Sequence, residues 1–351
     1  MNFLYIGGPS RSGTTAFTRY LNEHPEVMIC RERYKWGPRE RVTPAAFSFD
    51  KILDFDDGYE IRDTERRKRV HSELIASKDP HRLKWIGDKH PGYVKTLDLL
   101  ATNNPGASFI IMYRPVEEVA ESFESRSKNP NDAWLGGKEG FRMGVEHWNA
   151  AIQSTRKFIE SGVNLNVLIL VYEDFFARNE ECLPLISRFL NLDFDESVRE
   201  KWREESASFE SGRRNKDALS EEKRAFIKEN ADRETEMWIL GRIRRQWEEF
   251  NAHPPDLDRV LIEERRRSAV LIARKQTEAK HQVKILRHDL AKLEGEHQVV
   301  REKCKSLEAK NRRLAKRTES LERQLENIKS SRSWRILSGV NGIRARLPRK
   351  S

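Results

Sequence analysis

The chain has 351 residues, of which 35% are charged and 37% are hydrophobic, and it carries a formal net charge of +10. This length accommodates one α/β domain with additional material, and because the whole is too polar for one compact globule, we expect part of it to form an extended charged helix. The three cysteines are scattered, no apolar run reaches the about 18 residues of a membrane span, and the N-terminus lacks a signal-peptide pattern, so we expect a cytoplasmic protein without a disulfide framework.

The first recognisable element is a loop that follows an apolar, strand-like run at Phe3–Ile6 and precedes a helical segment at Ala16–Asn22. Backbone N–H groups and the helix dipole at such a helix start favour an anion. The loop, Gly8–Thr15, has the glycine spacing of nucleoside-triphosphatase loops. However, Thr14 stands where those loops have lysine, and Arg11 is the loop's side-chain cation. The loop is therefore predicted to bind phosphate or sulfate while departing from ATP and GTP machinery.

The residues from Pro9 to Thr15, Pro-Ser-Arg-Ser-Gly-Thr-Thr, resemble the 5′-phosphosulfate loop of sulfotransferases, enzymes that use 3′-phosphoadenosine-5′-phosphosulfate (PAPS). That family has a second element, a strand that ends in an arginine and is followed by a helical serine, which together hold the 3′-phosphate. Here Ser108–Tyr113, Arg114 and Ser122 stand at the same spacing. The resemblance implies an α/β fold, a P-loop-type parallel sheet flanked by helices, with PAPS as co-substrate and no metal.

The first 254 residues carry the α/β signal and are expected to form the sulfotransferase domain. Helical segments separate the apolar runs, which predicts a parallel sheet with crossover helices. The strand-like runs are Phe3–Ile6, Lys84–Ile86, Phe109–Tyr113 and Val167–Tyr172. The polar stretch 34–82 is interpreted as an insertion with acceptor contacts, and 127–140 as a loop at the active-site mouth. The domain is expected to end at His253-Pro254-Pro255.

A coiled coil is predicted for residues 255–330, because apolar residues recur there at seven-residue steps, a period that imposes a left-handed supercoil. The repeating positions are Ile272, Ala279, Leu286, Leu293, Val300, Leu307, Leu314, Leu321 and Ile328. Asn311 falls in the second core position, where one buried asparagine favours parallel dimers. Pairs such as Lys303 and Glu308 would attract across such a dimer. We therefore expect a marginally stable parallel homodimer, with a single solvated helix as the alternative.

The final segment, 331–351, contains six basic residues and no acidic ones: Arg332, Arg335, Arg344, Arg346, Arg349 and Lys350. Apolar residues, among them Trp334 and Leu337, recur between them at helical spacing, which suits an amphipathic helix at a membrane surface. The start of the segment also resembles a tail motif found after coiled coils in bacterial envelope-polysaccharide enzymes. The pattern predicts a peripheral membrane contact, with a solvated tail as the alternative, and no nucleic-acid partner.

Sulfuryl transfer requires donors around the phosphosulfate, a cation for the leaving oxygen and a base for the acceptor proton. The resemblance gives the first role to Arg11 together with Ser12, Gly13, Thr14 and Thr15. Arginine suits that role because its planar guanidinium binds tetrahedral oxyanions in a bidentate manner.

Lys89, in Gly87-Asp88-Lys89-His90-Pro91, is the predicted cation for the leaving oxygen, because this segment resembles the lysine-bearing strand end of tyrosylprotein sulfotransferases. Two candidates remain for the base. Glu32 corresponds in position to the catalytic glutamate of that branch, although its neighbours are Cys30-Arg31 and Arg33-Tyr34 rather than the Gly-Glu-Glu-Thr-Arg of that branch. His90 is the rival, since cytosolic sulfotransferases use a histidine just after a comparable lysine.

The resemblance implies that Arg114 and Ser122 hold the 3′-phosphate, with Arg126 one helical turn further on the same face. Tyr172, expected at the end of a strand, is a candidate nucleotide contact, with a core tyrosine as the alternative. Arg213 and Arg214 lie in a segment that resembles the late loop which closes over the donor.

These observations predict a PAPS-dependent sulfotransferase that acts on an acceptor hydroxyl, with a carbohydrate or other small molecule as the first expectation. The alternatives are a tyrosyl-protein-type sulfotransferase, a P-loop kinase-like enzyme, and a non-catalytic coiled-coil scaffold. The missing loop lysine argues against the kinase, and the set of Arg11, Lys89, Arg114 and Ser122 argues against the scaffold.

Overall fold

The computed structural model describes residues 1–35, 39–55, 64–129, 139–164, 166–177, 179–213, 219–253, 255–333 and 336. The chain divides into two units, residues 1–276 and residues 277–351.

The first unit is built on a five-stranded, entirely parallel sheet with the strand order β2-β3-β1-β4-β5. The strands are β1 (Asn2–Gly7), β2 (Val27–Arg31), β3 (Trp85–Lys89), β4 (Ser108–Tyr113) and β5 (Val167–Val171). The predicted fold class is thereby confirmed. Strand β2 was not predicted, and β3 extends three residues beyond its predicted end at Ile86.

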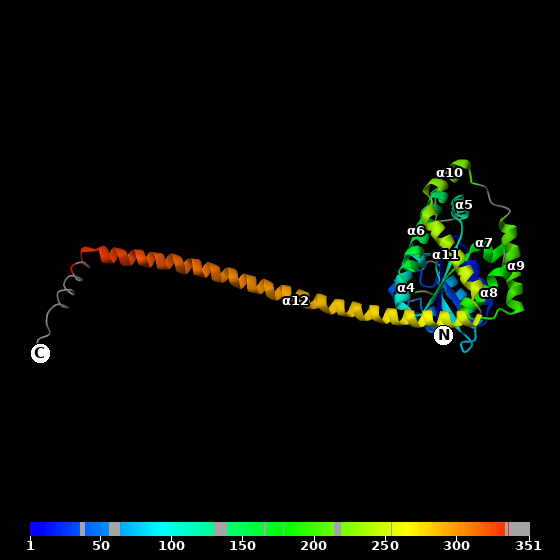
Figure 1. Ribbon diagram of the computed structural model, residues 1–351, viewed down its shortest axis with the longest axis horizontal. Coiled ribbons are helices and arrows are strands. Elements are labelled where there is room, and N and C mark those ends of the chain that lie inside the picture. Colours follow the sequence, from blue (N-terminus) through cyan, green and yellow to red (C-terminus); the bar gives the residue numbers. More distant parts are fainter. Residues whose placement is uncertain are drawn as a thin grey trace. The chain divides into compact units, whose positions relative to one another are not determined.

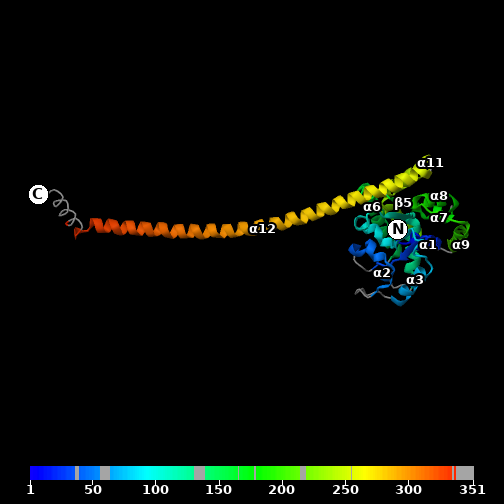
Figure 2. The ribbon, with the colours of Figure 1, turned by 90° about the horizontal axis from the view of Figure 1, so that it is seen from below.

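Helices cover both faces of this sheet (Figures 1 and 2). The α-helices of the first unit are α1 (Thr14–Glu23), α2 (Phe49–Leu53), α3 (Thr64–Ala76), α4 (Leu97–Asn103), α5 (Val116–Ser127), α6 (Gly140–Glu160), α7 (Tyr172–Ala177), α8 (Asn179–Leu190), α9 (Glu196–Arg213), α10 (Glu221–Asn230) and α11 (Arg233–Ala252). Short 3₁₀ helices are η1 (Arg39–Arg41), η2 (Pro44–Phe47) and η3 (Pro91–Thr96).

Alternating strand residues divide the core into two main layers, because successive side chains of a strand point to opposite faces. On one face, Ile6 and Ile110 are fully buried with Phe17 of α1 and Phe175 of α7. On the other face, residues such as Tyr5 pack with η3, α4 and α6. The carboxyl ends of the parallel strands meet at one edge, which is where ligands bind in open α/β sheets.

The polar stretch predicted as an insertion contains η1, η2, α2 and α3. The loop predicted at 127–140 lies between α5 and α6, and most of it falls outside the described residues.

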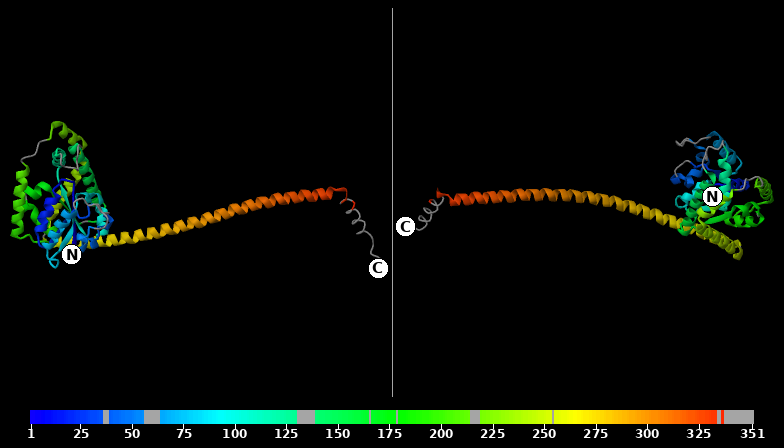
Figure 3. Two further views of the ribbon diagram at one scale, coloured as in Figure 1. Left: turned by 180° about the vertical axis from the view of Figure 1, so that it is seen from behind. Right: turned by 90° about the horizontal axis from the view of Figure 1, so that it is seen from above.

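The predicted long C-terminal helix is present as α12 (Pro255–Ser330), which runs without a break in the views of Figure 3. Its repeating apolar residues from Leu286 to Ile328 are exposed in the single chain; Leu293, for example, is 61% exposed. The pairing of two such helices and the domain limits 1–254, 255–330 and 331–351 remain predictions. Most of the predicted basic tail lies outside the described residues. In the part of the chain that the structure describes, no helix combines the length and apolar character needed to cross a bilayer.

Candidate active site

The predicted phosphate loop joins β1 to the start of α1 in a conformation that several left-handed residues impose. Gly13 precedes the helix with φ 82°, and Arg11 has φ 76° although it is not a glycine. A Cβ atom on Gly13 would lie 2.2 Å from Cε2 of Tyr172. Glycine is therefore required at position 13 for both its backbone conformation and its contact. Strained residues of this kind gather at ligand-binding loops.

The second predicted element lies against this loop. Arg114, at the end of β4, donates from Nη1 to the carbonyl oxygen of Arg11 at 2.9 Å. The Nε of Arg11 donates in turn to Oγ of Ser122 on α5, at 3.0 Å. The guanidinium of Arg114 also lies over the ring of Tyr172, 4.1 Å from its centroid. Two motifs more than a hundred residues apart thus lie together and bring two arginines, Arg11 and Arg114, into one site.

Acidic side chains also surround Arg114. Glu118 accepts from its Nε and Nη2 at 3.1 and 2.7 Å, and the nearest oxygen of Glu173 lies 3.9 Å from Nε. Burial, followed by the neighbouring Glu118, raises the pKa of Glu173 to about 7. The proposed 3′-phosphate site therefore includes a carboxyl group that changes charge near neutral pH.

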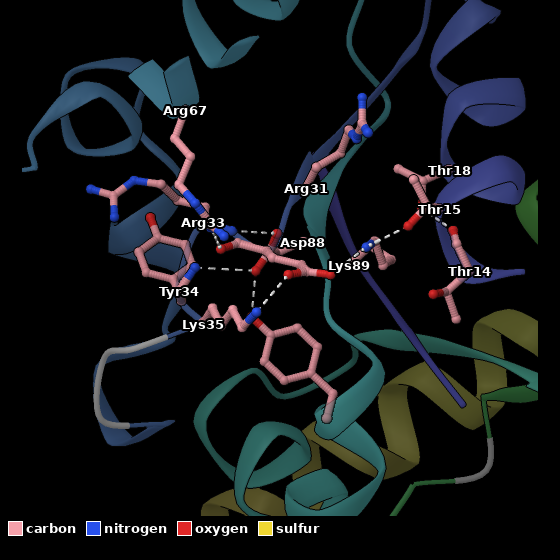
Figure 4. A network of polar contacts seen from close by, with 12 residues as sticks. Thr14, Thr15, Thr18, Arg31, Arg33, Tyr34, Lys35, Arg67, Asp88 and Lys89 are labelled. Carbon is pink, nitrogen blue, oxygen red and sulfur yellow. Dashed lines mark hydrogen bonds and ion pairs between the residues drawn. The ribbon is translucent and has the colours of Figure 1, made fainter. Parts of the chain in front are cut away.

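Lys89, the last residue of β3, links the phosphate loop to the candidate base. Its Nζ donates to Oγ1 of Thr15 and to Oε1 of Glu32, at 2.9 Å each (Figure 4). The Lys89 side chain is only 2% exposed. Burial lowers its pKa, and the Glu32 carboxylate opposes this effect.

Glu32 follows β2 and is ionised in this setting. Although burial alone favours its neutral form, the charge and hydrogen bond of Lys89 lower its pKa to about 2. Lys35 lies 3.5 Å from its second oxygen and acts in the same direction. An ionised carboxylate can accept a proton, and the lysine that contacts it balances its charge.

The rival base, His90, is also able to accept a proton. Burial, and next the charge of Arg39, lower its pKa to about 3, so the imidazole is neutral near pH 7. Its Nδ1 is buried and has no hydrogen-bonding partner among the described residues. The structure therefore leaves both Glu32 and His90 as candidates, and the contact with Lys89 distinguishes Glu32.

A cavity of about 1520 Å³ connects most of these groups. The predicted residues on its wall are Arg11, Gly13, Thr14, Thr15, Glu32, His90, Arg114, Arg126 and Tyr172. Three further predicted residues, Ser12, Lys89 and Ser122, are buried and are not part of this wall. The amide of Ser12 donates to the carbonyl of Pro9, so this predicted anion donor is occupied within the loop.

Of the remaining predicted residues, one differs from expectation and two are not fully described. Tyr172 begins α7 instead of ending β5, because the strand pattern runs directly into the helix without a turn signal. Arg213 is the last residue of α9, although its side chain is not described, and Arg214 lies outside the described residues. The predicted contribution of these arginines stays a prediction.

The site also contains several titratable residues that the sequence motifs did not predict. The cavity wall also includes Arg19, Lys35, Arg39, Lys95 and His147, which belong to no motif. Glu118 could have been found, since it follows Arg114 by four residues on a helix start, a spacing that favours ion pairs. Among the described residues, no group of three or more potential metal-ligating side chains is found.

Comparison with known proteins gives one family and a set of relatives. The chain is 26% identical over 201 residues to protein-tyrosine sulfotransferase A of Caenorhabditis elegans, covering 56% of this chain and 51% of that protein. It is 26% identical over 203 residues to protein-tyrosine sulfotransferase 1 of Danio rerio, covering 56% and 55%. The chain thus spans about half the length of these curated relatives.

Among solved structures, the sulfotransferase domain from the curacin biosynthetic pathway is 17% identical, with a TM-score of 0.39, covering 56% of this chain and 76% of that one. The model of the Sulfotransferase family matches residues 4–196. This match extends over more than half of the 351 residues and includes the phosphate loop, Glu32, Lys89, Arg114 and Ser122. The chain therefore belongs to the sulfotransferase family.

Proposed function

We propose that this protein transfers the sulfuryl group of PAPS to an acceptor hydroxyl. The observation that carries the proposal is the placement of Lys89, whose ammonium contacts both Thr15 of the phosphate loop and the Glu32 carboxylate. One cation thus contacts both the expected donor site and a candidate base, so the groups that the reaction needs are held close together.

The tyrosyl hydroxyl of a peptide or protein is the first candidate for the acceptor. The relatives over the matched half of the chain are protein-tyrosine sulfotransferases, and this favours the tyrosyl alternative over the carbohydrate that we expected first.

The chemistry of the cavity fits the proposed donor. Arg11, Arg114 and Arg126 contribute to its wall, and guanidinium groups bind phosphate and sulfate oxygens well. The N-terminus of α1 adds amide donors and a positive dipole end. The Tyr172 ring beside Arg114 offers an aromatic surface for a nucleotide.

The residues of the chain have distinct roles in the proposed reaction. When bound, PAPS supplies the sulfuryl group and its nucleotide leaves with the electron pair of the broken sulfur–oxygen bond. Glu32 accepts the proton of the acceptor hydroxyl, whose oxygen forms the new bond to sulfur. Lys89 stabilises the negative charge on the departing oxygen, and the loop around Arg11 holds the phosphosulfate.

For the second unit, we propose a parallel homodimer through α12, supported by the exposed heptad residues and by Asn311 in the core register. The basic residues after Ser330 support a peripheral contact with anionic membrane lipids at the cytoplasmic face, which agrees with the expected cytoplasmic location.

The experiment that tests the proposed reaction incubates the purified full chain with PAPS and two acceptor pools, tyrosine-containing peptides and oligosaccharides. Mass spectrometry then follows both the sulfated product and the release of 3′,5′-adenosine bisphosphate. Product in the peptide pool that disappears in Lys89→Met supports the proposal. Product in the oligosaccharide pool alone would overturn the tyrosyl acceptor. No release of 3′,5′-adenosine bisphosphate with either pool, together with no binding of that nucleotide, would overturn the proposed reaction.

A further inference from the structure

A buried aspartate beside Lys89 has no role in the reaction described so far. Asp88 lies in β3, is 0% exposed, and accepts three hydrogen bonds. Its Oδ1 accepts from the amide of Arg33 at 3.1 Å, and its Oδ2 accepts from the amide of Tyr34 at 3.4 Å and from the hydroxyl of Tyr93 at 2.6 Å. Two of these three donors belong to the turn that begins at Glu32 (Figure 4).

This turn requires stabilising contacts because its first residue has an unfavourable backbone conformation. Glu32 has φ 58°, a left-handed conformation that costs a residue with a Cβ atom free energy and persists only where the surroundings enforce it. The two amides that follow point at one carboxylate, an arrangement of successive N–H groups that binds anions.

The strand β3 holds the turn from both of its faces. Neighbouring strand residues point to opposite sides, yet Lys89 reaches the carboxylate of Glu32 while Asp88 binds the two amides that follow it. In addition, the carbonyl of Lys89 accepts from the amide of Glu32 at 2.7 Å. The position of the Glu32 carboxylate therefore depends on both side chains.

We propose that Asp88 is a positioning residue that fixes the Glu32 turn, so that the Glu32 carboxylate stays against Lys89 and toward the acceptor. This inference rests on the proposed function for its catalytic consequence, whereas its structural content concerns only the turn. Asp88 touches neither donor nor acceptor in this account and acts through Glu32.

The charge of Asp88 governs this support. Burial raises its pKa to about 6, and the hydrogen bonds from Tyr93 and from the turn limit the rise. A protonated carboxyl group loses acceptor capacity, so the turn loosens as the pH falls through about 6. The ionisable side chains that interact with Asp88 are Tyr93 in η3, Tyr5 in β1, Cys30 in β2 and the neighbouring Lys89.

The first test uses hydrogen exchange, which does not depend on activity. In Asp88→Asn, the side-chain amide can accept from one backbone N–H but presents a donor to the other. We expect faster exchange in a peptide covering residues 31–35 and unchanged exchange in residues 8–15. Tyr5→Phe is the matched control, because its buried hydroxyl has no hydrogen-bonding partner among the described residues. Unchanged exchange at 31–35 in folded Asp88→Asn would overturn the proposal, whatever the protein's activity.

The second test is kinetic and concerns the catalytic consequence. We expect kcat of Asp88→Asn to fall by about 10- to 100-fold, since small displacements of a reacting group have effects of this order, with the Kd for 3′,5′-adenosine bisphosphate unchanged. In the wild type, kcat at saturating donor should fall as the pH drops through about 6, and Asp88→Asn should be low and flat over that range. A parallel loss of kcat and nucleotide affinity would contradict a positioning role.

Tyr93→Phe keeps the test decisive if Asp88→Asn does not fold. This variant removes one hydrogen bond that lowers the pKa of Asp88. The pKa of Asp88 should therefore rise, and the fall of kcat on acidification should begin at a higher pH. A fall that begins at the same pH as in the wild type would contradict the inference. A wild-type protein without any activity would instead count against the proposed function, and the exchange result would still decide whether Asp88 holds the turn.

Discussion

The ammonium of Lys89 lies 2.9 Å from the carboxylate of Glu32, across 57 residues of sequence. The pair brings together the end of β3 and the turn after β2, because these neighbouring parallel strands align Arg31 with Lys89. Burying one partner of an ion pair without the other is costly. We therefore expect the two residues to depend on each other in both charge and position.

Replacing Lys89 by methionine should lower kcat by about 10²- to 10³-fold, which is typical for the loss of one group that stabilises transition-state charge. The replacement also removes the main cause of the low pKa of Glu32. That pKa should rise, and catalysis should fail first at acidic pH. Lys35→Met is the matched control, because Lys35 is 34% exposed and 3.5 Å from Glu32. Equal losses of kcat in both variants would remove the special role of Lys89.

Replacing each of the two candidate bases in a separate variant should identify the base by its effect on kcat. Glu32→Gln should lower kcat by about 10²- to 10⁴-fold, the usual range for loss of a general base, while His90→Gln should change it far less. Steady-state kinetics at saturating donor measures both. A large loss in His90→Gln together with an active Glu32→Gln would assign the base to His90.

Gly13→Ala should abolish donor binding. The new Cβ would lie 2.2 Å from the ring of Tyr172, so either the loop or the ring beside Arg114 must move. Gly162→Ala is the control, since Gly162 also has a positive φ, of 63°, but no neighbouring atom within 4 Å of the added Cβ. Calorimetry with 3′,5′-adenosine bisphosphate measures the difference. Normal affinity in Gly13→Ala would show that the Tyr172 contact is unimportant for the loop.

A charged residue in the predicted seam of α12 should separate the homodimer. Leu307→Lys places an ammonium in the apolar repeat, whereas Ala309→Lys adds the same charge two residues further, away from the predicted seam. Sedimentation velocity of the full chain should show monomers for the first variant and dimers for the second. A dimer that survives Leu307→Lys would mean that α12 does not provide the interface in the predicted register.

The parts of the site that the sequence predicted are those in which local chemistry specifies the structure. The glycines around Arg11 determine a loop between a strand and a helix, and the run that ends at Arg114 is long and apolar enough to indicate a buried strand. Lys89 could be placed near the site because it follows the short apolar pair Trp85-Ile86 in a segment that resembles the lysine-bearing strand end of tyrosylprotein sulfotransferases.

The remaining features depend on contacts between distant segments. Glu32 and Asp88 are 56 positions apart by number, and only the alignment of β2 with β3 brings the turn onto Asp88. A single aspartate in a short strand gives no sign of this role. Similarly, the Tyr172 ring lies beside Gly13 and under the Arg114 guanidinium, and no local pattern indicates these contacts.

The most direct test of the proposed reaction is calorimetric titration of the full chain with 3′,5′-adenosine bisphosphate, without metal, alongside ATP with Mg²⁺. Arg114→Ala provides the site-specific variant, because Arg114 lies on the cavity wall beside the loop. The account predicts binding of the bisphosphate without metal, loss of that binding in Arg114→Ala, and weaker binding of ATP. A preference for ATP with Mg²⁺, or no binding of the bisphosphate, would contradict the proposed donor.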